Sequence, residues 1–327
     1  MKKIEQILST GNAFKVDNIA CMQHAEVLKH YQRPAEFFTW SDRSLELQLA
    51  FKVAFISICH QFNWDFMQAT LAAKLLKHET DFAEYLLSVK STDLSDWLKK
   101  YPKQERVRAK ERAFILRDVG KTLSEVYAGS LERFYEHCSR SFLDNSNNKQ
   151  GESFHEIMDQ FEGFRKDSLK KKTNVLSHDL IKENIVSFVD EENSQPAIDY
   201  HIMRLYIRTG RVIPTDPSLF KFLSGAPNPR GTLVRLLREA VAQAERLTAY
   251  YSGLNVADLN YIEWQIGRSI CKNKAPVCQS LKFPSGFPDD VSKLCDNNCP
   301  YIEICLSYNQ MSEFISFEEP LYVSTDY

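Results

Sequence analysis

Five of the chain's eight cysteines lie within 35 residues, between positions 271 and 305. A chain of 327 residues can bury a core large enough to fold without disulfides. In a reducing compartment, clustered cysteines hold metal more often than they form disulfides. We therefore expect this part of the chain to fold around a group that its thiols bind. The five are Cys271, Cys278, Cys295, Cys299 and Cys305.

The spacing of these cysteines bears on the kind of metal site. Successive cysteines are separated by 6, 16, 3 and 5 residues. A structural zinc site usually has two close pairs, separated by about two to four residues, and only Cys295 and Cys299 form such a pair. A cuboidal iron–sulfur cluster takes one thiolate at each of its irons from different directions, which suits wider gaps. The spacing favours a cluster over zinc, and unligated thiols are the third interpretation.

The composition predicts a mostly helical protein. The chain has only 11 glycines and 12 prolines, and it contains long runs of Leu, Lys, Glu and Ala. No apolar run reaches the roughly 18 residues that span a bilayer, and the N-terminus lacks a signal-peptide core. We therefore expect a cytoplasmic protein with no membrane partner. The net charge of −2 is low for a dedicated nucleic-acid binder, so that role would depend on local basic patches.

Apolar residues recur at helical spacing in several segments. Residues 45–76 predict two buried helices joined near 60–63, and residues 103–138 predict helices with a break near Gly129. The polar segment 143–152 predicts a loop. No segment shows the alternation of a strand, so an all-α architecture of two helical lobes with a cysteine-bearing appendage is expected. Further helices are predicted at 20–31, 171–189 and 199–209, the last followed by Gly210 as its C′ residue.

Asp199 lies where the helix 199–209 is expected to begin, in "IDYHIMRLYIRTG". The simplest interpretation is an N-cap, because a carboxylate there accepts the first amides and gains from the helix dipole. Arg204 and Arg208 are four residues apart and share one face of this helix, away from the apolar face that includes Leu205.

The segments "IEWQIGRSICKNKAPVC" and "CPYIEIC" resemble the C-terminal cluster loop of endonuclease III-type DNA glycosylases. In that family a Gly-Arg-x-x-Cys start is followed by gaps of six, two and five residues. This chain keeps the six and the five, and inserts residues 279–298 where the gap of two would be. The resemblance implies a [4Fe–4S] cluster, with Cys295 as the alternative to Cys299. The implied ligands are Cys271, Cys278, Cys299 and Cys305.

The "IDYH" segment is similar to the "VDTH"-centred segment of helix-hairpin-helix glycosylases, which an Arg-rich helix follows. The resemblance implies that Asp199 is the catalytic carboxylate. Cleavage of an N-glycosidic bond develops positive charge on the sugar, and a fixed anion stabilises that charge or activates a water. A capping aspartate is also a rigidly held one, so the two interpretations are compatible.

Two further segments are similar to parts of the same family. "FISICHQFNWDFMQATLAAKLL" matches its early helix pair and places Gln61 where a side chain enters the gap left by an extruded base. "GFRKDSLKKKTNVLSHDL" lies at the hairpin position, where Lys171 or Lys172 matches the lysine that forms a Schiff base in bifunctional members. The family's Gly-x-Gly hairpin is absent here, and a solvated basic run explains the lysines equally well.

The remaining binding residues follow from the same resemblance. Phe62, Trp64 and Tyr200 are candidates to stack on the base, with a core role as the alternative for Trp64. Gln61 also has an alternative, as an ordinary surface loop residue. Predicted phosphate contacts are Lys166, Lys170, Lys171, Arg204 and Arg208.

The middle of the chain, about residues 45–215, also resembles the queuosine-salvage N-glycosylase family. "HQFNWDF" is similar to its aromatic-rich segment, and Ile198-Asp199-Tyr200-His201 matches its "ADYR"-like motif. That family shares the helical glycosylase fold but releases a modified base from a nucleotide, and it lacks the cysteine loop. Both resemblances imply the same role for Asp199.

Together these patterns predict a monomeric N-glycosylase that excises a damaged or modified base from DNA, flipped into a pocket between the lobes. The alternatives are a nucleotide-level glycohydrolase for a queuosine-like base and a non-catalytic metal-bearing nucleic-acid-binding module. The predicted organisation is an N-terminal helical extension (1–44), a two-lobed core (45–260), a cluster loop (261–310) and a C-terminal tail (311–327).

Overall fold

Helices make up 61% of the chain and strands 2% in the computed structural model, which confirms the all-α class. The structure describes residues 7, 10–34, 38–139, 141–142, 152–225, 231–280, 283, 286, 288–310 and 316–319. Most of the predicted loop 143–152 and of the predicted tail lies outside these residues. No helix in the described part of the chain combines the length and apolar character needed to cross a membrane.

The chain divides into two units. Unit 1 combines residues 1–34 with 195–323, and unit 2 comprises residues 35–194 together with 324–327. The N-terminal segment is therefore part of unit 1, where helix α2 packs against helix α13.

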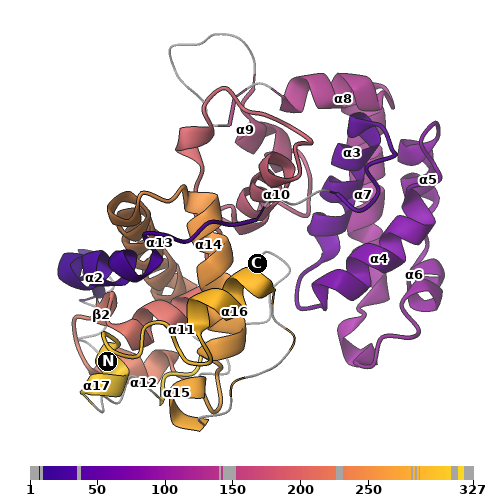
Figure 1. Cartoon of the computed structure of the whole chain (residues 1–327). Helices are drawn as coiled ribbons and strands as arrows, with labels where there is room; N and C mark the ends of the chain where they lie inside the picture. The colour runs from indigo at the N-terminus through magenta and orange to yellow at the C-terminus, as the bar shows by residue number, and fades with distance from the viewer. Residues whose placement is uncertain are drawn as a thin grey trace. The chain divides into compact units, whose positions relative to one another are not determined.

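Unit 1 contains a small sheet and a series of helices (Figure 1). Strands β1 and β2 pair antiparallel, with Lys15 opposite Ile213. This sheet was not predicted from the sequence. Each strand has only three residues, too few for alternation to show, and the partner lies far along the chain. The elements are β1 (Phe14–Val16), α2 (Asn18–Leu28), α11 (Tyr200–Thr209), β2 (Val212–Pro214), α12 (Ser218–Leu223), α13 (Gly231–Ser252), α14 (Val256–Gln265), the π-helix η3 (Ile266–Ile270), α15 (Val277–Ser280), α16 (Asp289–Cys295) and α17 (Leu306–Asn309).

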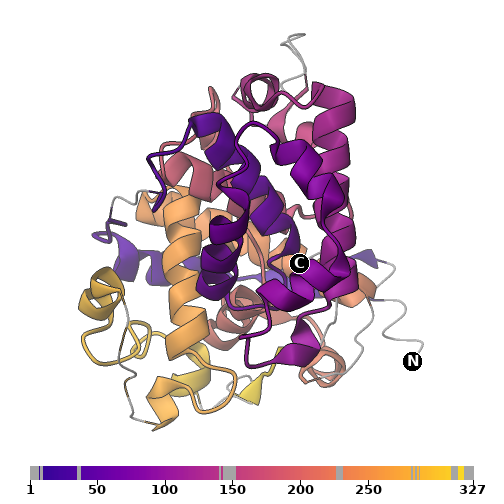
Figure 2. The ribbon, with the colours of Figure 1, turned by 90° about the vertical axis from the view of Figure 1, so that its right-hand side faces the viewer.

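Unit 2 is built around helix α3, which is buried along most of its length. A helix that is hydrophobic all round belongs in a core, and α7, α8 and α10 all pack on it. Helices α5 and α6 pack against α7 (Figures 1 and 2). The elements are α3 (Leu45–Ile58), α4 (Trp64–Leu75), α5 (Phe82–Ser88), α6 (Ser91–Trp97), η1 (Gln104–Arg106), α7 (Ala109–Tyr127), α8 (Leu131–Cys138), α9 (Phe154–Asp159), α10 (Lys171–Lys182) and η2 (Glu191–Asn193).

Several predicted helix boundaries are confirmed. The turn between α3 and α4 falls at residues 59–63, and Gly129 lies in the break between α7 and α8. Gly210 ends α11 with a φ of 79°, the left-handed conformation expected of a C-terminal glycine. The helix expected at 171–189 is shorter, because Asn184 also takes a positive φ and α10 ends at Lys182.

Candidate functional site

The predicted site residues are divided between the two units. Those of unit 1 are Asp199, Tyr200, Arg204, Arg208, Cys271, Cys278, Cys299 and Cys305. Those of unit 2 are Gln61, Phe62, Trp64, Lys166, Lys170, Lys171 and Lys172.

The four cysteines that the resemblance implies as cluster ligands line a single pocket. Cys271 follows the π-helix η3, Cys278 lies in α15, and Cys305 precedes α17. Cys295 is 3% exposed on α16 and is not among the described residues that line the pocket. Within the described ranges, no three His, Cys, Asp or Glu side chains form a group that could hold a single metal ion as placed.

The thiols of the pocket influence one another electrostatically. The pKa of Cys278 is raised to about 11, mainly by burial and also by the nearby Cys271 and Cys305, while Arg208 acts in the opposite direction. Burial also raises the pKa of Cys299, again with contributions from Cys271, Cys305 and Cys278. The pKa of Cys295 is raised to about 12 by burial alone. The pKa values of Cys278 and Cys299 therefore depend on other thiols of the pocket, whereas that of Cys295 does not.

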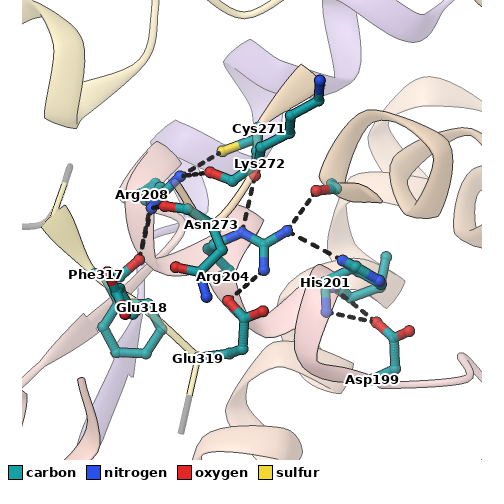
Figure 3. Close-up of polar contacts among 12 residues, drawn as sticks. Asp199, His201, Arg204, Arg208, Cys271, Lys272, Asn273, Phe317, Glu318 and Glu319 are labelled. Carbon is teal, nitrogen blue, oxygen red and sulfur yellow. Dashed lines mark hydrogen bonds and ion pairs between the residues drawn. The ribbon is translucent and has the colours of Figure 1, made fainter. Parts of the chain in front are cut away.

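Arg208 fastens the segment that carries Cys271 to helix α11 (Figure 3). Its guanidinium donates to the carbonyl oxygens of Lys272 (2.6 Å), Asn273 (2.8 Å) and Phe317 (2.8 Å). One N–H also points at the Cys271 Sγ, 3.6 Å away. The side chain is 2% exposed, so Arg208 holds the cysteine segment rather than a phosphate.

Arg204 has the same kind of role one helical turn earlier. It donates to the carbonyl oxygens of Cys271 (2.8 Å) and Gly267 (2.5 Å) and forms an ion pair with Glu319 (Figure 3). Both arginines are buried and donate to backbone oxygens, so this structure offers no support for the phosphate contacts predicted for them. Their spacing of four residues does place them on one face of α11, as expected.

Replacing Arg208 by methionine should destabilise unit 1 by at least about 2 kcal/mol, since buried carbonyl groups lose charged donors. If the four cysteines of the pocket bind a metal, the variant should also hold less of it, because the Cys271 segment loses part of its attachment to α11. Thermal unfolding and metal analysis of the purified protein measure both effects. Arg235→Met on α13 is the matched control, because Arg235 is half exposed and pairs only with Glu239 among the contacts described here. Equal stability of the two variants would contradict this role for Arg208.

Asp199 caps helix α11, as predicted. Its Oδ1 accepts the backbone N–H groups of His201 (2.8 Å) and Ile202 (3.0 Å). Its Oδ2 accepts the indole N–H of Trp264 (3.1 Å). The residue is only 4% exposed. The carboxylate is therefore held by three donors in one orientation.

The backbone before Asp199 is also held. Arg238 on α13 donates to the Ile198 carbonyl oxygen (3.3 Å), and Asn260 on α14 donates to that of Ala197 (3.5 Å). Tyr200, which follows Asp199, is 37% exposed, with its ring centroid 4.2 Å from that of His201. The exposed Tyr200 ring is compatible with the stacking role that we predicted for it.

A buried polar network lies between α11, α14 and the cysteine segments. Glu263 pairs with Arg211, and both side chains are fully buried. Glu263 also accepts hydrogen bonds from the hydroxyl groups of Tyr206 and Tyr301, the latter at 2.9 Å. Tyr301 lies between Cys299 and Cys305 in sequence and lines the same pocket. The network therefore anchors the second half of the cysteine loop, as the arginines of α11 anchor the first.

In unit 2, Gln61 lies at the tip of the α3–α4 turn with a φ of 54°. Such a left-handed conformation is uncommon outside glycine and persists where the surroundings hold it. Arg112 provides this support, because its buried guanidinium donates to the carbonyl oxygens of Ile58 (3.0 Å) and His60 (2.7 Å). The turn that carries Gln61 is thus rigidly built.

The two aromatic residues after Gln61 already contact protein rings. Phe62 stacks on Tyr101 with centroids 3.7 Å apart, and Trp64 meets Phe55 edge to face at 4.5 Å. Both pack against the core of unit 2. These contacts favour the core role that we considered for Trp64.

The lysines of unit 2 differ in their surroundings. Lys172 is 3% exposed, and its Nζ donates to the Ser57 carbonyl oxygen (2.6 Å). It is therefore not part of a solvent-exposed basic run. Lys171 is partly buried at the first position of α10. Lys166 is exposed and pairs with Glu162, and Lys170 pairs with Asp159.

The turn before α10 forms without the Gly-x-Gly of the family's hairpin. Asp167 Oδ1 and Oδ2 accept the backbone N–H groups of Leu169 (3.1 Å) and Lys171 (2.9 Å). Lys170 takes the positive φ that a glycine would otherwise supply.

Three residues that build the site were not predicted from sequence, namely Trp264, Glu263 and Arg112. Each contacts a partner at least 38 residues away, and no local pattern connects such pairs. For Trp264 one signal was available, because it lies in the same "IEWQIGRSIC" segment as the first cysteine.

No model of a known protein family matches this sequence, and no curated protein is detectably similar to it.

Proposed function

We propose that this protein is an N-glycosylase that carries a [4Fe–4S] cluster and excises a damaged or modified base from DNA. The observation that carries the proposal is the construction of helix α11. The helix begins at Asp199, and its Arg204 and Arg208 hold the segment of Cys271, one of four thiols that line a common pocket. A cluster there would brace the helix that presents the carboxylate.

The distribution of the four cysteines around the pocket supports a cluster rather than a single zinc ion in this proposal. Tetrahedral zinc with Zn–S bonds of about 2.3 Å brings its sulfur ligands to roughly 3.8 Å from one another. A cuboidal cluster places an iron–sulfide core between the thiolates, so its ligands stand farther apart and approach from four sides. Cys271, Cys278, Cys299 and Cys305 come from separate turns around one cavity. An N–H at Cys271 Sγ, as Arg208 provides, is also a typical contact of cluster ligands.

Asp199 would supply the chemistry of bond cleavage. As the N-glycosidic bond breaks, positive charge develops on the sugar, and an anion fixed beside it stabilises that charge or orients an attacking water. Three donors hold the Asp199 carboxylate in place, so it needs little reorganisation during the reaction. The cluster supplies structural bracing when bound, and no bond-breaking step requires it.

A second candidate function is a non-catalytic nucleic-acid-binding module. The low exposure of Asp199 and its complete capping geometry favour this alternative, because a cap needs no access to a substrate. A glycohydrolase for a modified nucleotide remains the alternative within the same reaction class.

One assay distinguishes the three. Anaerobically purified protein is incubated with duplex and single-stranded DNA that carry a panel of base lesions, and separately with modified nucleotides. Release of free base is measured by mass spectrometry. Release from DNA supports the proposal, and release from nucleotides alone supports salvage. Salt-dependent DNA binding without release from any substrate would leave the non-catalytic module.

A lyase step would act through the lysines of α10. Should the protein also cleave the DNA strand, borohydride should trap a covalent adduct that the double variant Lys171→Gln/Lys172→Gln cannot form. Lys170→Gln is the matched control, because Lys170 belongs to the same run and its Nζ pairs with Asp159. Trapping that survives the double variant would remove both lysines from the nucleophile role. Base release without trapping would indicate an enzyme that uses water.

A further inference from the structure

Trp264 reaches Asp199 from another helix. It lies on α14, and its Nε1–H donates to Asp199 Oδ2 at 3.1 Å. An indole nitrogen can only donate, so this contact fixes Oδ2 as the acceptor. None of the sequence patterns assigned a role to Trp264.

The three donors leave little freedom to the carboxylate. An ionised carboxylate offers about four acceptor positions, and the described contacts of Asp199 occupy two on Oδ1 and one on Oδ2. The position that remains is on Oδ2, beside the indole. Without the indole, the capping bonds would hold Oδ1 alone, and Oδ2 would lose the donor that sets its direction.

The indole ring is itself held on two sides. The Arg268 guanidinium lies over it, with its central carbon 4.9 Å from the ring centroid. The His201 ring meets it edge to face, with centroids 6.3 Å apart. A cation on the ring face draws electron density from the indole and strengthens its N–H as a donor.

The π-helix after Trp264 packs tightly on α11. A Cβ at Gly267 would lie 2.8 Å from the His201 carbonyl oxygen, so only glycine permits this approach. Arg204 connects the two segments further, because one of its nitrogens contacts both the Gly267 carbonyl oxygen and the His201 ring. Single-turn π-helices occur often at functional sites. Here the turn joins Trp264 to Cys271, so one short segment places both the indole and the first pocket thiol.

We propose that Trp264 is a positioning residue that holds Asp199 Oδ2 and directs its remaining acceptor position toward the substrate. This inference rests on the proposed function, since it assigns Trp264 a part in the action of Asp199. It adds that the π-helix segment Ile266–Ile270 connects the cluster pocket to the carboxylate.

Trp264→Phe tests the inference, because it keeps an aromatic ring and removes the N–H. We expect kcat for base release to fall about tenfold to a hundredfold, which corresponds to one lost hydrogen bond to a charged group. KM and iron content should stay near the wild-type values, whereas Tm should fall modestly, because the buried Oδ2 of Asp199 loses its donor. Trp97→Phe in unit 2 is the matched control and should leave kcat unchanged, because its ring contacts Tyr85 and no predicted site residue among those described.

Other outcomes would overturn the inference. If Trp264 instead stacks on the base, Trp264→Phe will keep its activity and Trp264→Leu will raise KM. Wild-type kcat in Trp264→Phe overturns the positioning role while the proposed function stands. Absence of base release from wild-type protein on every substrate would overturn the proposed function itself.

The contact also has a readout that needs no activity. Serine is a good N-cap, but its side chain is too short to reach the indole, so Asp199→Ser should preserve α11 and free the Trp264 N–H. The indole proton resonance of Trp264, assigned by its loss in Trp264→Phe, should then move upfield and exchange faster with solvent. An unchanged resonance would show that the hydrogen bond does not form in solution, and the inference would fail.

Discussion

Asp199→Asn should release base at least about a hundredfold more slowly than the wild-type protein, while it keeps its iron. The substitution removes the anion that a developing sugar cation needs. Loss of one such electrostatic partner typically costs about a hundredfold to a thousandfold in rate, or roughly 3–4 kcal/mol of barrier. Single-turnover rates with enzyme in excess measure this effect on the chemical step directly.

The structure changes what we expect of the stability of this variant. From sequence, asparagine should cap α11 as well as aspartate does, because its oxygen can still accept the N–H groups of His201 and Ile202. However, the asparagine amide group would then face the indole N–H of Trp264, and two donors cannot satisfy each other. An unsatisfied buried donor costs about 1–3 kcal/mol, so Asp199→Asn should be measurably less stable than the wild type.

A second variant separates stability from catalysis. Adding Trp264→Phe to Asp199→Asn removes the conflicting donor and should recover part of the lost stability without restoring base release. Asp17→Asn is the matched control, because Asp17 caps α2 in the same unit through a bond to Ala20 N (3.0 Å). If Asp199→Asn cleaves at nearly the wild-type rate, Asp199 is only a cap and the proposed mechanism is wrong.

The other large effect concerns the pocket thiols. Anaerobically purified protein should be brown, with close to about four irons per chain, since four thiolates suit a four-iron cluster. Replacing Cys271, Cys278, Cys299 or Cys305 by alanine should reduce the iron to less than about one per chain. The Tm of unit 1 should fall as well, because the loop would lose the cross-links of the cluster and depend on protein contacts such as those of Arg204, Arg208 and Tyr301.

Cys295→Ala provides the internal control for this series. Cys295 is more buried than the pocket thiols but lies outside the described lining of the pocket, so its loss should leave the iron content unchanged. If Cys299→Ala retains its iron and Cys295→Ala loses it, Cys295 is the cluster ligand in place of Cys299. Colourless protein with one zinc per chain would contradict the cluster.

The helices could be predicted from sequence because their determinants are local. The α3–α4 pair follows from apolar residues at helical spacing, with Asn63 as the cap of α4. Helix α11 ends at Gly210 because glycine readily adopts the left-handed conformation that ends a helix. The end of α10 was misplaced because Asn184 can adopt either a helical or a left-handed conformation. The β1–β2 pair was missed because its hydrogen bonds join segments about 200 residues apart.

The roles of charged residues were harder to predict. Residues 170–172 are all lysines, yet their surroundings differ. Lys172 is buried and donates to the Ser57 carbonyl oxygen, whereas Lys170 forms an ion pair with Asp159. Arg204 and Arg208 look equally suited to phosphate, and both instead satisfy backbone carbonyl groups. Charge and spacing are local properties, whereas the partner that a charge finds depends on which segment packs against it.

By itself, the sequence determined the all-α class and the cap at Asp199, which depend on periodicity and on a single capping side chain, and both act over short distances. The candidate ligand set among the cysteines came from the family resemblance and stays a prediction. Only the tertiary structure decided that Cys271, Cys278, Cys299 and Cys305 share one pocket while Cys295 does not, and that Trp264 holds the second oxygen of Asp199. These arrangements depend on the packing of α14 and η3 against α11, where Gly267 permits a close approach that no local pattern encodes.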